Sequence, residues 1–211
     1  MATYTLTQYA EMFLRQSAGG YVSAEFELTL SDIKAYICTV YPAIMTQHIR
    51  AKRAADEDPF SGAEGSWVKV TDCIETEHEC DCGVDKYFIS LSGIKYCELS
   101  NGQGIVSVAG CGGYALTKVN IQMGMRFSAL EASSVAAPAF WVEKERIRFT
   151  GSIGKVQVWY VPDPYSLSED EPFPLPADTA AYQALEQMVM AKIQQFLSIP
   201  EDTTDDSSET I

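Results

Sequence analysis

The change of hydrophobic period near residue 60 is the feature that most constrains the fold of this chain. From Ile33 to Ile49, apolar residues recur every three or four positions, which predicts an amphipathic helix of about twenty residues. Beyond the polar segment AADEDPFSGAEG at 54–65, apolar and polar residues alternate as they do in strands. A chain that must bury both a helical stripe and a sheet face predicts an α+β fold.

The helical part of the sequence is predicted to begin with a short helix. Thr5 to Gln16 carries its apolar residues on one side and is followed by Gly19 and Gly20. A brief extended segment from Phe26 is expected next, with Ser31 as the N-cap of the long helix. Pro42 removes a backbone donor, so this helix is predicted to bend or break near Thr39 to Tyr41.

The middle of the sequence predicts an antiparallel β-rich region with tight turns. Asn101-Gly102 and Glu143-Lys144-Glu145 are typical of hairpin turns. In the last predicted strand, Gln157 marks an outward side that Trp159 shares, whereas Val158 faces inward. The predicted strands are Trp67–Cys73, Lys86–Leu91, Ile94–Leu99, Gly104–Val108, Leu116–Gln122, Phe140–Val142, Arg146–Thr150 and Val156–Val161.

The C-terminal quarter predicts a proline-punctuated extended arm, a helix and a flexible tail. Five prolines between Pro162 and Pro176 favour an extended backbone, and Asp178 is a suitable N-cap for the helix after them. The last segment, EDTTDDSSETI, is acidic and almost without apolar residues, which predicts disorder. Apolar residues predicted to contact other subunits are Tyr182, Leu185, Met188, Val189, Ile193, Phe196 and, from the last strand, Trp159.

These segments predict one α+β domain over residues 1–197. It comprises a helical part at 1–53, a β-rich part at 66–161 and the arm and helix at 162–197, followed by the tail at 198–211. The start of the chain does not read as a secretory signal, and its most apolar run, 135–142, is too short to span a membrane. We therefore expect a protein that is made in a cytoplasm and has no membrane partner.

The net charge of −14 argues against nucleic-acid binding, because such a surface repels phosphate. Five of the carboxylates lie in the tail, at Glu201, Asp202, Asp205, Asp206 and Glu209. The six cysteines are too few for a disulfide scaffold in a chain of 211 residues, so free thiols are expected.

The sharpest chemical cluster is a set of four soft ligands, Cys73, His78, Cys80 and Cys82. Their residue types suit tetrahedral zinc, but Cys80 and Cys82 lack the two to four intervening residues of a zinc knuckle. The alternatives are small apolar side chains beside a loop histidine, or a disulfide. The cluster is a weak metal candidate.

No other pattern in the sequence nominates a catalytic or cofactor site. The glycines between Gly102 and Gly113 match neither dinucleotide nor phosphate-loop spacing, so turns and bulges explain them. His48 lies on an apolar helix face, and Cys38 has no histidine near it in sequence. No catalytic residue and no cofactor are expected. The alternative to a structural protein is a carbohydrate- or metal-binding β-module that uses Trp141, Trp159 or the cysteine cluster.

The order of these features resembles the neck proteins of tailed bacteriophages. The segments FWVEKERIRF-TGSIGKVQVWYVPDP and PFPLPADTAAYQALEQMVMAKIQQFL are similar to the aromatic hairpin, strand, proline-rich link and final helix of ring proteins in crAss-like phages. The likeness covers roughly residues 80–197 and rests on order and pattern. It transfers no catalytic residue, because these families have none.

The resemblance implies a homo-oligomeric ring between portal and tail, around the DNA exit channel of a virion. Its partners would be further copies of itself, with twelve implied by a portal, together with the portal and neighbouring ring or tail proteins. Genomic DNA would pass through without specific binding. Each subunit of a closed ring must present two different complementary surfaces, which an arm and an amphipathic helix can supply.

Overall fold

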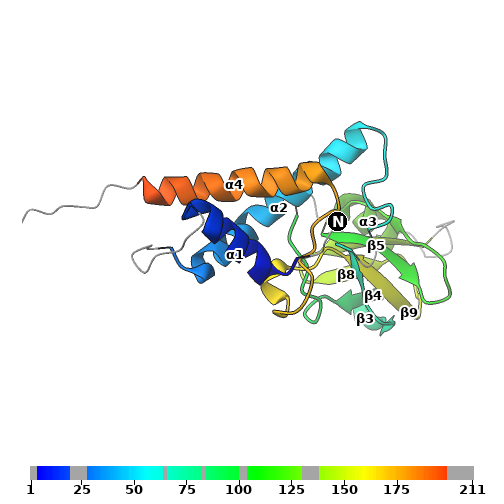
Figure 1. Ribbon diagram of the computed structural model, residues 1–211. Coiled ribbons are helices and arrows are strands. Elements are labelled where there is room, and N and C mark those ends of the chain that lie inside the picture. The colour runs from blue at the N-terminus through cyan, green and yellow to red at the C-terminus, as the bar shows by residue number, and fades with distance from the viewer. Residues whose placement is uncertain are drawn as a thin grey trace, which may run out of the picture.

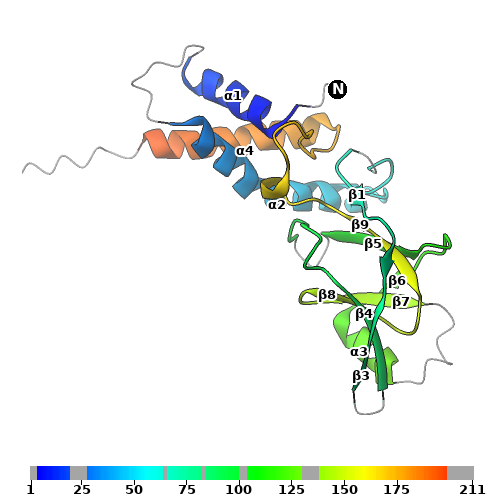
Figure 2. The ribbon, with the colours of Figure 1, turned by 90° about the horizontal axis from the view of Figure 1, so that it is seen from below.

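The computed structural model describes residues 4–19, 28–63, 66–81, 84–99, 104–129 and 138–198, and its architecture is α+β as predicted. A layer of three helices lies on one side of the β-structure (Figure 1). The view in Figure 2 separates this helical layer from two sheets stacked beyond it. The predicted turn at Asn101-Gly102 and the tail at 199–211 fall outside the described residues.

The helical layer contains α1 (Leu6–Ser17), α2 (Leu30–Ala54) and α4 (Thr179–Leu197). Thr5 and Thr29 begin the first two helices, each in a reciprocal capping box. The predicted cap at Ser31 is therefore wrong by two residues, because the hydroxyl of Thr29 accepts from the backbone N–H of Asp32. Asp178 caps α4, which confirms the prediction for that helix.

Pro42 does not break α2, which is continuous from Leu30 to Ala54. Buried side chains flank the proline on both sides, with Tyr41 before it and Ile44 and Met45 after it. The free energy gained by burying these large side chains in one uninterrupted helix exceeds the cost of the one backbone hydrogen bond that Pro42 cannot make. The prediction of a break is wrong for this reason.

The first sheet is centred on β9 (Lys155–Tyr160). One edge of β9 pairs with β5 (Ile105–Gly110), and the other pairs with two short strands, β1 (Lys69–Val70) and β2 (Ile74–Glu75). The strand predicted at Trp67–Cys73 is thus interrupted at 71–73. The strand predicted at Ile94–Leu99 is reduced to a bridge between Tyr96 and Pro162.

The second sheet has the order β3-β4-β8-β7-β6. Its strands are β3 (Glu77–Asp81), β4 (Val84–Ser90), β8 (Arg146–Phe149), β7 (Ala139–Glu143) and β6 (Thr117–Lys118). The turn between β7 and β8 at Lys144, with φ 52°, confirms the predicted hairpin. Instead of a strand reaching Gln122, the chain forms α3 (Ile121–Ala129), whose first turn is capped by the side chain of Asn120.

Alternate residues of β9 face two different hydrophobic cores. Val156 and Val158 are buried between the sheets, whereas Val161, just beyond the strand, is buried against the helices. The first sheet is therefore the middle layer, covered on both faces. This double coverage explains why β9 carries apolar residues on both of its sides.

Candidate functional site

The apolar stripe of α4, which comprises the residues of this helix that were predicted to contact other subunits, lies mostly in the chain's own core. Leu185, Val189 and Ile193 are at most 1% exposed and belong to the cluster that α4 forms with α1 and α2. A fully covered side chain offers no surface to another subunit while this fold is intact. For these three residues, the expectation of a contact surface is corrected to a structural role.

The other members of the stripe, Tyr182, Met188 and Phe196, are partly buried against the same cluster. The hydroxyl of Tyr182 lies 3.6 Å from the sulfur of Met12 on α1, which fixes the ring at the edge of the layer. Beyond Phe196, the side chain of Leu197 is 49% exposed. The apolar part of α4 that reaches solvent is therefore confined to its C-terminal end and its borders.

Trp159 also lies between elements of the same chain. Its side chain is partly buried and packs against the helical core, on the face of β9 opposite to Val158. The prediction that Val158 points inward is confirmed, but the side that Trp159 shares is covered by the helical layer. Alternation along the strand identified the two sides correctly but could not show that both are packed.

The proline segment after β9 lies on the body of the molecule. Pro164, Phe173, Pro174 and Pro176 are buried. The hydroxyl of the fully buried Tyr41 donates to the carbonyl oxygen of Pro174 at 2.8 Å. The segment includes a short 3-10 helix, η3 (Pro164–Ser166), so the prediction of an extended arm is wrong at these residues. Phe173 belongs to the same buried cluster as residues of α2 and α4.

A cleft of about 560 Å³ opens where this segment meets α2. Nδ1 of His48 lies 3.6 Å from a carboxylate oxygen of Asp178, and its ring packs edge-on against Trp67. Burial lowers the pKa of His48; the carboxylate of Asp178 opposes this shift, and the cation of Lys52 adds to it. Since Lys52 is paired with Glu57 at 2.6 Å, the polar groups of the cleft are largely matched to one another.

The proposed metal cluster is not assembled in this fold. Cys73 forms a disulfide with Cys111, and a disulfide sulfur is not a thiolate ligand. His78 and Cys80 are both exposed on β3, and Cys82 lies outside the described residues. Within the ranges that the structure describes, no three His, Cys, Asp or Glu side chains lie close enough to hold a metal ion.

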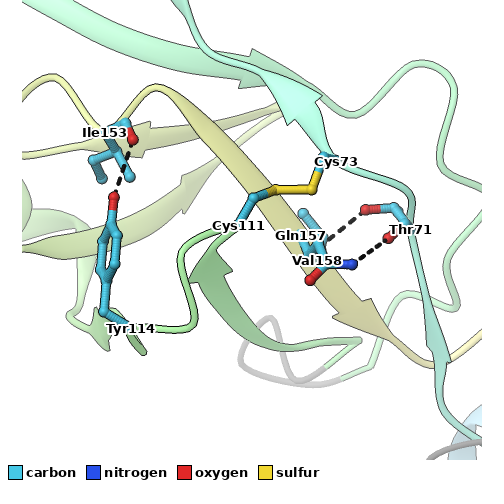
Figure 3. Close-up of a disulfide and its surroundings, with 7 residues drawn as sticks. All are labelled: Thr71, Cys73, Cys111, Tyr114, Ile153, Gln157 and Val158. Carbon is cyan, nitrogen blue, oxygen red and sulfur yellow. Dashed lines mark hydrogen bonds between the residues drawn. A yellow bond between two sulfur atoms is a disulfide. The ribbon is translucent and has the colours of Figure 1, made fainter.

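The disulfide corrects the expectation of free thiols. Cys73 comes from the interruption between β1 and β2, and Cys111 follows β5, so the bond crosses the central strand β9 (Figure 3). Its partners are separated by 38 residues, which is why sequence spacing did not pair them. Burial raises the pKa of the free thiols of Cys38 and Cys97 to about 11 and about 12, which keeps both protonated near neutral pH.

The carbohydrate-binding alternative loses its main support in this structure. Trp141 is only 3% exposed, and its ring lies so close to Gly124 of α3 that a Cβ atom there would clash with it. A sugar cannot stack on a ring that is covered in this way. Trp159 is likewise engaged with the helical core.

No protein-family model matches the chain, and no curated protein is similar to it in sequence. Among the described residues, none of the helices is both long enough and apolar enough to cross a membrane.

Proposed function

We propose that this chain is a structural virion subunit that forms a homo-oligomeric ring in the head-to-tail connector of a tailed bacteriophage. The ring would lie between portal and tail, around the DNA exit channel. The observation that carries the proposal is the return of the proline segment and α4 onto α1 and α2. It gives the subunit a helical layer at one side and a β-layer at the other (Figures 1 and 2).

Two unlike sides are what a closed ring requires of its subunit. In a ring, one surface of each copy contacts a different surface of the next copy, so the two must be complementary rather than identical. The acidity of the chain supports a channel role as well, because a wall with a net charge of −14 would not retain the phosphates of passing DNA. The proposal also draws on the resemblance of the sequence pattern to neck proteins.

The outer face of α4 is the surface that we assign to the subunit contact. Gln183, Gln187, Ala191 and Gln194 are exposed and recur at helical spacing along it. The charged residues of α4 are Glu186 and Lys192, both half-buried, and Glu186 accepts from the side chain of Gln16 on α1. An uncharged face suits contact between copies of an acidic chain, because interface cores are depleted of charge.

A pair of matched double variants tests this surface. Gln187→Glu with Ala191→Glu places two carboxylates on the outer face of α4, and Gln47→Glu with Ala51→Glu makes the same changes at exposed positions of α2. Native mass spectrometry with the portal protein should show ring formation reduced at least tenfold for the first variant and unchanged for the second. Circular dichroism checks that both variants fold.

Electron microscopy of the protein with its portal, or of the parent particle, tests the function itself. The expected result is a ring at the portal–tail junction. A chain that stays monomeric at high concentration and also fails to bind portal or neighbouring neck proteins would exclude the proposal. Normal rings from the α4 variant would instead exclude only the assigned surface.

A further inference from the structure

We propose that the Cys73–Cys111 disulfide is a lock that is open while the subunit is made and closes after the particle has left the reducing cytoplasm. This inference concerns the regulation of the proposed ring subunit and rests on that function. The bond joins two segments that flank the central strand of the first sheet (Figure 3). Neither cysteine is used by the contact surface on α4.

The disulfide connects the two strands that pair with β9 in the first sheet. Val156 of β9 pairs with Ile74 of β2 at one edge and with Gly110 of β5 at the other. Cys73 directly precedes Ile74, and Cys111 directly follows Gly110. Closing the bond therefore ties together the two strands that enclose β9, and it links positions 38 residues apart in sequence.

The two cysteines are held near one another by contacts that do not depend on the bond. The backbone N–H of Cys111 donates to the carbonyl oxygen of Lys155 at 2.9 Å, and the hydroxyl of Tyr114 donates to Ile153 at 3.0 Å. On the other side, the backbone N–H of Val158 donates to the hydroxyl of Thr71 at 3.1 Å. With Cα atoms 6.2 Å apart, the reduced thiols remain positioned to pair.

The bond is also open to exchange with solvent thiols, because both Cys73 and Cys111 are exposed. Disulfides seldom persist in a cytoplasm, where glutathione keeps accessible thiols reduced. On oxidation, the two protein thiols lose two hydrogen atoms to one glutathione disulfide, which becomes two glutathione molecules. The same exchange in reverse opens the lock.

The experiment uses the full-length chain equilibrated in buffers that range from excess reduced glutathione to excess glutathione disulfide. Maleimide labelling with peptide mapping follows the pair, and thermal unfolding follows its effect. We expect an unbonded but folded protein in the reducing buffer. In the oxidising buffer the Cys73–Cys111 bond should form and raise Tm by roughly 5–15 °C, as expected for a loop of this length.

Serine variants supply the controls. Cys73→Ser and Cys111→Ser should each abolish the redox-dependent shift in Tm, whereas Cys80→Ser, at an exposed cysteine of β3, should retain it. A bond that persists in excess reduced glutathione, never forms in glutathione disulfide, or leaves Tm unchanged would overturn the lock. Failure to form rings with portal in either redox state would count against the proposed function instead, since the titration does not depend on assembly.

Discussion

At the residue scale, the junction between α2 and α4 contains His48, a histidine whose surroundings lower its pKa. His48 packs on the edge of Trp67 and lies beside Asp178, the residue that caps α4. Burial is the largest influence on its pKa and lowers it, while Asp178 draws it partly back. The folded protein therefore binds a proton at His48 less readily than the unfolded chain does.

This difference gives a pH dependence with a definite sign. Because the folded pKa lies below the ordinary 6.5, the stabilisation from neutral His48 is complete above pH 6.5 and is lost as pH falls through the folded value. We expect His48→Gln to lose less unfolding free energy between pH 7.5 and pH 5 than the wild type in urea titrations. Gln47→Ala, on the exposed side of the same helix, should keep the wild-type pH dependence. Equal losses in wild type and His48→Gln would contradict this account.

Leu185 tests whether the apolar stripe of α4 belongs to the monomer. The side chain is completely buried against the other helices, so Leu185→Ala should lower the free energy of unfolding by about 2–5 kcal/mol. Gln195→Ala, exposed on the same helix and outside the assigned contact surface, should change it by less than about 0.5 kcal/mol. Urea titration at two protein concentrations provides the measurement. A loss from Leu185→Ala that disappears on dilution would mean that the residue acts between subunits.

At the element scale, the proline segment acts as a strap whose anchor is Phe173. Its ring packs edge-on against Tyr9 of α1 at 5.6 Å and against Tyr41 of α2 at 5.3 Å. We expect Phe173→Ala to cost about 3–5 kcal/mol of unfolding free energy, because the truncation leaves a cavity between the strap and both helices. Tyr165→Ala removes an aromatic ring from the same segment at a side chain that is 65% exposed, and it should cost little. Chemical denaturation measures the unfolding free energy of the two variants. Equal losses would show that Phe173 does not anchor the segment.

The elements that sequence patterns predicted well are those set by local interactions. Asp178 caps α4 through a bond to the nearby N–H of Ala180, and alternation separated Val158 from Trp159. The covering of Trp159 was not predictable, because it depends on helices far away in sequence. In the same way, the 116–122 segment gave no sign that a two-residue strand ends before α3 begins.

The predictions of the cysteine cluster and of the contact surface on α4 were wrong for the same reason, because both depend on contacts between residues far apart in sequence. Cys73 lies near His78 and Cys80 in sequence, yet its disulfide partner is Cys111. Cys111 follows β5, which pairs with the edge of β9 opposite to β2. The stripe on α4 was recognised as amphipathic, but periodicity cannot distinguish a face that meets its own chain from one that meets a second copy. Leu185 and Val189 are buried because they belong to one cluster with residues of α1 and of the proline segment, and the sequence pattern does not show that contact.

At the scale of the whole molecule, charge opposes the association of copies. Subunits of net charge −14 repel one another, so assembly through an uncharged face of α4 should become more favourable as salt screens that repulsion. Light scattering between 0.05 and 0.5 M NaCl should show increasing association. Association that weakens steadily with salt would instead indicate a contact built from opposite charges.

Deletion of the acidic tail tests the same repulsion between copies. Removing residues 201–211 takes away five carboxylates and only one large apolar residue, so it reduces repulsion between copies. We expect the truncated chain to unfold at the wild-type Tm and to form rings with portal at least as readily as the full chain, measured by native mass spectrometry. Replacing the five tail carboxylates by amides in the full-length chain is the matched control and should behave as the deletion does. If the deletion abolished rings while the amide variant retained them, the tail would make a contact that charge alone does not describe.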